Sequence, residues 1–358
     1  MKRIKVIFAP TVNDDNPYLS QLIANLQKIN IQVETISSNS FFLSAVISHW
    51  KPDIVHFHWL DPLFQVPNRN KFKSILKLLS FIVQLIILKI SGVKIVWTVH
   101  NLKNHENLNL FLDRISSFMV FRLAKAIITH CNAAKEEFLE VFSGTNTDKI
   151  FVIPHGNYVD SYENKIEKPI AREKLCLKQS GTIFLFLGLI RPYKGVFELI
   201  DTFKQLDNDE AQLVIAGKIY RDSPEIAEAL IQKISDDKRI KLIPGFVPSE
   251  EVQFYMNACD IVIFPYRDVL TSGAVLLAMS FGKACIAPRK GCIGEALDDT
   301  GAFLYKIDDE SGLIQAMKSA LCKHSELSFM GQHNRYLAEK YNWKHVAEMT
   351  DDVYRSCL

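Results

Sequence analysis

The chain has 358 residues, of which 48% are hydrophobic and 23% are charged, a composition typical of well-packed soluble proteins. It does not indicate disorder. One ordinary hydrophobic core rarely holds so long a chain, so we expect two domains. The net charge is only +2, and no nucleic-acid partner is expected. Residues 1–10 contain a short apolar run before Pro10 and predict a first strand rather than a signal peptide, hence a cytoplasmic protein.

Short apolar runs alternate with amphipathic stretches along the whole chain. In the first half they predict strands at 4–9, 32–36, 54–57, 94–99, 126–129 and 150–153. In the second half they predict strands at 182–188, 212–216, 239–243, 260–264, 284–286 and 302–304. Segments between them, such as 132–142 and 223–235, have helical periodicity. Strands that alternate with helices form parallel sheets, so the pattern predicts an α/β protein of two doubly wound domains.

A polar stretch, residues 157–170, separates the two sets of strands and is the natural linker. We predict a first domain over residues 1–165, a second over 166–335, and a C-terminal helix over 336–358 that crosses back to the first. In open α/β sheets, ligands bind beyond the carboxyl ends of the strands. Two such domains facing each other would form a central cleft, with functional residues at the strand ends.

Histidines gather at strand ends in the first half, which contains seven of the ten. His58, His100 and His130 each follow a predicted strand. Imidazole can bind a hydroxyl group or accept a proton near neutral pH. Each of these histidines has an alternative interpretation, in which its ring is satisfied by nearby backbone or packing. No pair has the spacing of a helical metal site, so we expect no metal.

A basic stretch without acids runs from Pro62 to His105. Its cations are Arg69, Lys71, Lys73, Lys77, Lys89, Lys94 and Lys103. Within it, residues 75–90 are mostly apolar, but the run is too short and too interrupted to span a bilayer, which needs ~20 apolar residues. Two interpretations stay open. The segment is either a packed crossover helix or a helix that lies on an anionic membrane surface through residues 69–90.

Two strand-to-helix junctions in the second half suit an anion. Arg191 and Lys194 follow the strand that ends near Gly188, where cations and helix N-terminal amides can bind a diphosphate. At the other junction, Ser272 or its neighbour can cap a helix, and a glycine at 273 lets backbone amides approach an anion. Each junction alone could be an ordinary loop or cap. Two in one domain, at the same end of its strands, are better explained by one ligand.

Residues 182–306 resemble the C-terminal domain of glycosyltransferase family four. Gly188-Leu-Ile-Arg-Pro-Tyr-Lys-Gly-Val is similar to that family's phosphate-binding strand, loop and helix, and Ile-Ala-Gly217-Lys to its second strand and turn. Pro-Gly245-Phe-Val-Pro resembles its nucleotide-base loop, and Ala278-Met-Ser-Phe-Gly-Lys its Ala-Met-x-x-Gly-Lys motif. The resemblance implies a GT-B fold, with two Rossmann-like domains facing a cleft. It also implies a metal-independent, retaining hexosyltransferase that uses a nucleotide-diphosphate sugar.

The resemblance implies a role for each candidate residue. The donor diphosphate would be bound by Arg191, Lys194, Ser272, Gly273 and Ala274, and the nucleotide by Gly188, Gly217, Gly245, Phe246 and Val247. His100 would be the catalytic residue that contacts the transferred sugar. The acceptor side would comprise Asn16, Tyr18, His58, Trp59 and His130. The implied partners are a UDP- or GDP-sugar and a saccharide or lipid-linked saccharide, with no cofactor. The implied location is cytoplasmic, at the inner face of the plasma membrane.

Several positions depart from the family pattern. Val269 and Leu277 replace two glutamates, Leu189 stands where an arginine is usual, and residues 13–18 replace a Gly-rich turn. These changes leave open how the hexose and ribose are bound and whether configuration is retained. They also keep two alternatives, a sugar-nucleotide epimerase and a non-catalytic nucleotide-binding subunit. Asp207–Asp209 has the Asp-x-Asp form of metal-dependent transferases, but it precedes a strand and is interpreted as a loop.

Overall fold

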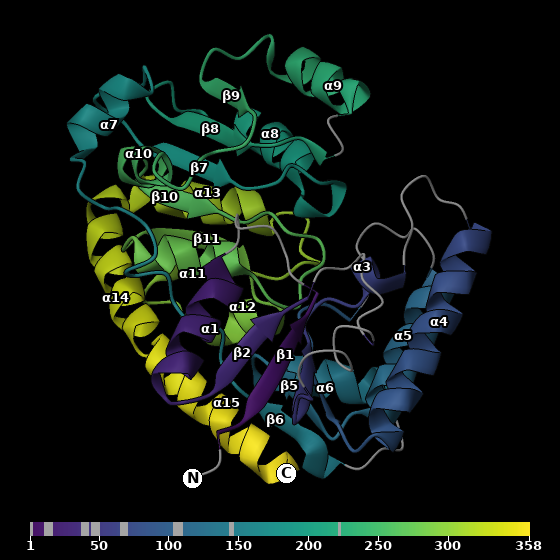
Figure 1. The fold of residues 1–358 in the computed structure, drawn as a ribbon. Helices are drawn as coiled ribbons and strands as arrows, with labels where there is room; N and C mark the ends of the chain where they lie inside the picture. The colour runs from purple at the N-terminus through teal and green to yellow at the C-terminus, as the bar shows by residue number, and fades with distance from the viewer. Residues whose placement is uncertain are drawn as a thin grey trace. The chain divides into compact units, whose positions relative to one another are not determined.

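The computed structural model describes residues 3–10, 17–36, 43, 51–64, 71–102, 110–142, 147–220 and 223–358. The chain divides into two compact units. The first unit comprises residues 1–156 together with 342–358, and the second comprises residues 157–341. Each unit contains one six-stranded sheet (Figure 1).

The sheet of the first unit has the order β2-β1-β3-β4-β5-β6, and all its pairs are parallel. Its strands are β1 (Lys5–Ala9), β2 (Gln32–Thr35), β3 (Ile54–Phe57), β4 (Lys94–Thr98), β5 (Ala126–Thr129) and β6 (Ile150–Val152). Every residue of β3 and β5 is buried, because helices exclude water from both faces of a parallel sheet. The strand order reverses between β1 and β3, which makes their carboxyl ends the expected ligand position.

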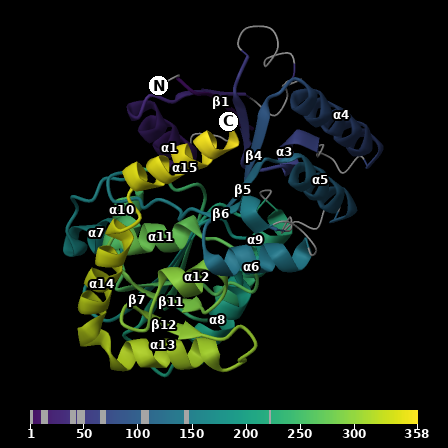
Figure 2. The same cartoon turned by 90° about the horizontal axis from the view of Figure 1, so that it is seen from below.

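The helices of the first unit cover its sheet from two sides. They are α1 (Pro17–Lys28), α3 (Asp61–Phe64), α4 (Lys71–Ile90), α5 (Leu110–Leu123), α6 (Asn132–Val141) and α15 (Trp343–Cys357). Helices α1 and α15 pack together on one face, and α4 and α5 lie side by side on the other (Figure 2). Helix α15 joins this core although it comes last in the chain, because its buried Trp343, Val346 and Tyr354 pack in one cluster with strand β1.

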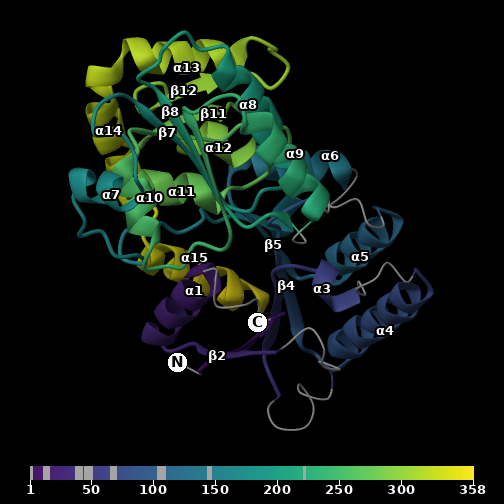
Figure 3. The same cartoon turned by 90° about the horizontal axis from the view of Figure 1, so that it is seen from above.

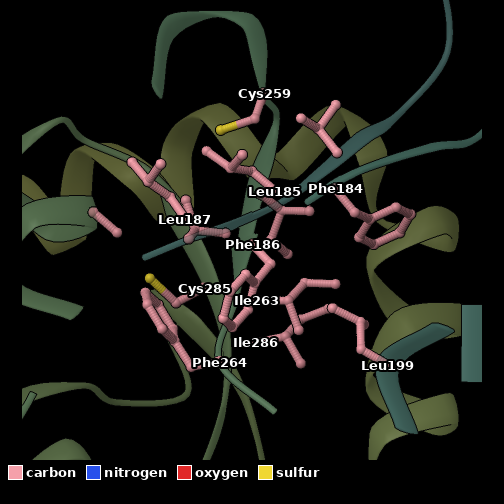
Figure 4. Close-up of a cluster of buried hydrophobic side chains, with 14 of the residues drawn as sticks. Phe184, Leu185, Phe186, Leu187, Leu199, Cys259, Ile263, Phe264, Cys285 and Ile286 are labelled. Atoms are coloured by element: carbon pink, nitrogen blue, oxygen red, sulfur yellow. The ribbon is translucent and has the colours of Figure 1, made fainter. Parts of the chain in front are cut away.

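The sheet of the second unit has the order β12-β11-β10-β7-β8-β9 and is also parallel. Its strands are β7 (Ile183–Leu187), β8 (Gln212–Gly217), β9 (Ile240–Pro244), β10 (Ile261–Ile263), β11 (Ala284–Pro288) and β12 (Ala302–Tyr305). The order reverses between β7 and β10. In its core, Phe186 of β7 lies beside Ile263 of β10 and Ile286 of β11 (Figure 4).

The helices of the second unit follow the strands in alternation. They are α7 (Lys168–Lys174), α8 (Val196–Lys204), α9 (Pro224–Ile234), α10 (Val252–Ala258), α11 (Gly273–Ser280), α12 (Gly291–Ala296), α13 (Gly312–Cys322) and α14 (Leu327–Glu339). Helices α8 and α9 lie on one face of the sheet, and α10 and α11 on the other (Figure 3).

All twelve predicted strands are present, and their ends differ from the prediction by at most two residues. The predicted α/β class with two doubly wound sheets is confirmed. The contacts divide the chain after Gly156 and after Tyr341. Among the helices that the structure describes, none combines the length and the apolar character needed to cross a bilayer.

Candidate active site

The loops after β7 and β10 meet where the strand order of the second unit reverses. The backbone N–H of Arg267 donates a hydrogen bond to the carbonyl oxygen of Tyr193 (2.9 Å). Gly195 has a φ of 68°, and a Cβ there would lie 2.0 Å from the carbonyl oxygen of Pro265. Only glycine fits such a contact between two backbones. The structure therefore brings the two predicted anion-binding junctions together at one switch point.

Lys194 reaches across this loop to the end of β7. A Cβ on Gly188 would lie 3.1 Å from Nζ of Lys194, and Nζ lies 5.5 Å from the ring centre of Tyr266. Burial, helped by the nearby positive charge of Arg191, lowers the pKa of Lys194 to about 8. A bound anion would favour the charged form of the ammonium group and so raise this pKa again.

Three glycines end the neighbouring strands β7, β8 and β9. Gly188, Gly217 and Gly245 have φ values of 143°, 146° and 131°, and Gly245 N–H donates to the carbonyl oxygen of Gly217 (3.2 Å). A Cβ on Gly217 would lie 1.9 Å from the carbonyl oxygen of Gly188. The predicted nucleotide-binding glycines thus lie along one sheet edge. Phe246, next in the chain, is 55% exposed, and Val247 packs partly against the core.

Helix α11 begins at this switch point with a capped N-terminus. Ser272 Oγ accepts a hydrogen bond from Val275 N–H (3.4 Å), and the same hydroxyl is hydrogen-bonded to Tyr266. The first amides of a helix, here those of Gly273 and Ala274, have no acceptor within the helix. They can therefore bind an anion.

Tyr266 and the ion pair between Arg267 and Glu198 were not predicted from the sequence. Arg267 Nε donates to Glu198 Oε2 at 2.6 Å, which ties the β10 loop to the first turn of α8. None of these three residues belongs to a motif that can be recognised from its spacing in the sequence.

The positions that lack the family's glutamates are packed rather than polar. Val269 is 3% exposed, and Leu277 packs partly against the core of the second unit. The backbone beside Val269 also contacts the start of α12, where a Cβ on Gly291 would lie 2.8 Å from the carbonyl oxygen of Val269. The cations and amides of this site have no carboxylate beside them at these two positions.

In the first unit, histidines from neighbouring strand ends form one cluster around Tyr18. Its ring centre lies 4.7 to 5.7 Å from those of His58, His100, His130 and His155. Parallel strands end at a common edge, which brings these distant positions together. Asn16, which is also predicted to lie on the acceptor side, lies outside the described residues.

Three of these rings form a chain of hydrogen bonds with a defined direction. His130 Nδ1 lies 3.0 Å from the carbonyl oxygen of Ile153 and must donate to it. His130 Nε2 of the neutral ring then accepts from His100 Nδ1 (3.3 Å), and His100 Nε2 accepts from His58 Nδ1 (3.2 Å). The chain ends at His58 Nε2, a buried acceptor with no hydrogen-bond partner.

Burial keeps the whole cluster neutral near pH 7. It lowers the pKa of His56 and of His155 to about 3 and that of His130 to about 4. The pKa values of His58 and His100 are also well below the usual range. Burial is the largest cause, and the electrostatic effect of the other histidines lowers both values further. The rings therefore act as neutral donors and acceptors.

A second set of polar contacts supports this cluster from the core. His56 Nδ1 lies 2.7 Å from Tyr354 Oη, and His56 Nε2 lies 2.8 Å from Thr98 Oγ1. The two-residue spacing of His56, in β3, and His58, directly after it, could have revealed His56. No local signal could have revealed Tyr354, which comes from α15.

Trp59, which is predicted to lie on the acceptor side, has one face of its indole ring covered by a histidine. In the structure, one face of its indole stacks on His100, with ring centres 4.3 Å apart and an interplanar angle of 12°. A sugar ring could use only the other face.

The described residues contain no group of three or more His, Cys, Asp or Glu side chains arranged to hold a metal ion. The Asp-x-Asp segment lies in the loop between α8 and β8, where Asn208 Oδ1 accepts hydrogen bonds from two following backbone amides. This loop precedes β8, at the edge opposite the glycines. The predicted loop structure is therefore present.

The chain resembles known glycosyltransferases in sequence. Residues 181–323 match the family described as glycosyl transferases group 1. The GDP-mannose:glycolipid 4-beta-D-mannosyltransferase of Xanthomonas campestris is 26% identical over 88% of this chain and 83% of its own length. The lipopolysaccharide 1,2-N-acetylglucosaminetransferase of Salmonella typhimurium is 25% identical over 58% of this chain and 56% of its own.

Solved structures resemble the whole chain. The sucrose-phosphate synthase of Thermosynechococcus elongatus has a TM-score of 0.79 and 16% identity, covering 99% of both chains. Anabaena HepE, solved with UDP and glucose, has a TM-score of 0.76 and 16% identity, covering 99% of this chain and 100% of its own. With the two parallel sheets, this likeness confirms the predicted two-domain α/β GT-B fold.

Proposed function

We propose a specific reaction for this chain, which is a family-four-like GT-B glycosyltransferase that uses a nucleotide sugar and acts in glycan or glycolipid biosynthesis. It transfers a hexose from a UDP- or GDP-sugar to a lipid-linked saccharide without a metal ion. The second unit binds the donor, and the histidine cluster of the first unit contacts the sugar and the acceptor. The observation that carries this proposal is the convergence of Lys194, Gly188 and the α11 N-terminus at one switch point.

The donor site follows from the charges at that switch point. Arg191, Lys194 and the amides of residues 272–274 would bind the two phosphates, with Gly217 and Gly245 leaving room for the nucleotide. When the bond to the sugar breaks, the departing diphosphate gains negative charge, and fixed cations and amides stabilise that charge most. Because Arg191 and Lys194 attract negative charge, the site should favour the diphosphate over a neutral nucleoside.

His100 is the proposed catalytic residue, at the centre of the hydrogen-bonded chain. A neutral imidazole can bind a sugar hydroxyl through its accepting nitrogen. In His100 that nitrogen, Nε2, accepts from His58, so a sugar hydroxyl would replace this bond. Tyr18, His58, Trp59 and His130 would then line the acceptor side.

The proposed acceptor places the enzyme at the inner face of the plasma membrane. The Xanthomonas relative is named for a glycolipid substrate, which supports a lipid-linked acceptor. The basic stretch 69–90 would contact the anionic surface. Arg69 lies outside the described residues, whereas Lys71, Lys73, Lys77 and Lys89 are exposed on α4.

The function is tested with the purified chain, a panel of UDP-, GDP- and ADP-sugars, and lipid-linked saccharides. We expect transfer from one UDP- or GDP-sugar, unchanged by EDTA. Conversion of the donor without acceptor would instead indicate an epimerase, and binding without turnover a non-catalytic subunit. Activity that EDTA abolishes and magnesium restores would contradict the metal-independent mechanism. The anomeric configuration of the transferred sugar is determined in the same product. The family resemblance predicts that it is the same as in the donor.

Replacing His100 by Ala should lower turnover at least about tenfold, because a positioned proton-transfer or hydrogen-bonding group contributes that much or more. Affinity for the nucleoside diphosphate should stay within about twofold, since the proposed diphosphate ligands belong to the second unit. The matched control is His345→Ala, an exposed histidine on α15 of the same unit. Thermal unfolding checks that both variants fold. Full activity of a folded His100→Ala protein would give His100 a purely structural role.

A further inference from the structure

Helix α4 has two apolar faces, and only one of them is buried. Leu78, Phe81, Leu85 and Leu88 pack into the first unit. The other face consists of large apolar side chains whose exposed fractions run from 41% for Ile86 to 80% for Ile90, namely Phe72, Ile75, Leu76, Leu79, Val83, Ile86 and Ile90. The packed crossover helix that was predicted as one alternative is therefore present, and the membrane-surface alternative stays a prediction. The helix also presents an apolar surface.

The exposed residues form one continuous stripe. At 3.6 residues per turn, their seven positions fall within about 100° of the helix circumference. Helix α5 lies alongside α4 (Figures 1 and 2) and adds Phe111, 71% exposed, and Phe118, 50% exposed. We call these nine residues the α4–α5 apolar face. Scattered apolar residues are ordinary on a surface, but a stripe of this length marks an interaction site.

The charges beside the stripe identify its partner. Helix α4 carries Lys71, Lys73, Lys77 and Lys89 and no acidic residue, and all four lysines are exposed. By the same helical period, Lys71 and Lys89 flank one side of the stripe and Lys73 flanks the other, whereas Lys77 lies toward the opposite side of the helix. An apolar stripe with cations on both sides matches the acyl chains and anionic headgroups of a lipid monolayer.

A second copy of the chain fits this face less well. A symmetric dimer places the same patch of each copy against the other. Such pairing would bring the lysines of the two α4 helices close together, with no acid on either helix to offset their repulsion. An anionic lipid surface offsets the same charges.

We propose that the α4–α5 apolar face inserts into an anionic lipid monolayer, with α4 lying in the plane of the surface and its lysines at the headgroups. The inference rests on the proposed function only through the lipid-linked acceptor. Insertion of this face would hold the enzyme at the surface where that acceptor lies. The stripe supplies most of the attachment, and the lysines add selectivity for anionic lipid. Attachment should therefore weaken in high salt without disappearing.

The test is co-sedimentation of the full-length protein with neutral and with anionic phospholipid vesicles, each at low and high salt. The variant Leu76→Ser/Leu79→Ser/Val83→Ser removes three exposed side chains from the middle of the stripe. Its binding should fall about tenfold or more in every condition. The control Ile231→Ser/Phe329→Ser removes two equally exposed apolar residues from the second unit and should bind like the parent. Lys71→Ser/Lys73→Ser should lower binding to anionic vesicles only.

The outcomes separate this inference from the proposed function. Absence of vesicle binding by the parent, or equal binding by the triple serine variant, would overturn the inference. A parent protein that is a dimer in solution, together with a triple variant that is a monomer, would also overturn it, since a second copy would then cover the face. Transfer to a saccharide acceptor without a lipid tail should be the same in the triple variant and the parent. If neither transfers sugar while the parent binds vesicles, the proposed function fails and this surface assignment stands.

Discussion

Between about pH 6.5 and pH 4 the first unit should lose on the order of several kcal/mol of stability, because its buried histidines cannot take up protons while folded. The pKa values of His56 and His155 are about 3 and that of His130 is about 4, whereas an unfolded chain has histidines near 6.5. As the pH falls below that value, the unfolded state binds protons that the folded state does not. Each histidine then lowers the free energy of unfolding by up to about 1.4 kcal/mol per pH unit.

Tryptophan fluorescence can follow this loss in one unit. All four tryptophans, at positions 50, 59, 97 and 343, belong to the first unit. Urea titrations at pH 7, 6 and 5 should show a falling midpoint. His155→Gln should reduce the number of protons taken up on unfolding by up to about one proton. His345→Gln, which changes an exposed histidine, should leave that number nearly unchanged. An equal midpoint at pH 7 and pH 5 would contradict the buried, neutral cluster.

Replacing Lys194 by Ala should weaken binding of the nucleoside diphosphate by ~1.5–3 kcal/mol, the range for hydrogen bonds to charged groups. Arg191→Ala should have a similar effect, and affinity for the free nucleoside should not change in either variant. Titration calorimetry measures both ligands. The matched control is Lys178→Ala, which removes an exposed lysine of the same unit that bonds to the carbonyl oxygen of Asp209. Unchanged diphosphate affinity in both site variants would remove this assignment.

The same lysine predicts how binding depends on pH. The pKa of Lys194 is lowered to about 8 in the free protein, and a bound diphosphate should raise it. Above pH 8 the free lysine is mostly neutral and must take up a proton to bind, so affinity should fall by up to about tenfold per pH unit. In Lys194→Arg the charge persists, because arginine stays protonated. That variant should lose this pH dependence even if its affinity is lower.

Local patterns were sufficient for the fold class and for part of the proposed donor site. A buried parallel strand is a continuous apolar run in the sequence, such as Phe184–Leu187. The strand can therefore be predicted from the sequence where a polar residue or a glycine ends the run. Gly188, Lys194 and Ser272 lie directly after such strands, and the position of a residue at a strand end is a local property. Tyr266 and the Glu198–Arg267 pair carry no local signal, because their partners are set by how two loops pack.

The sequence by itself determined the order of the elements, the two sheets and the residues at their carboxyl ends, since each depends on a periodicity of a few residues. Tertiary structure alone decided the rest. The direction of the His130–His100–His58 chain depends on distances between strands, and the contact of Tyr354 with His56 joins positions about 300 residues apart. The apolar residues of α4 have the same character on both faces, so composition could not tell which face packs. Only the position of α4 against the sheet and α5 shows that the stripe from Phe72 to Ile90 is left exposed.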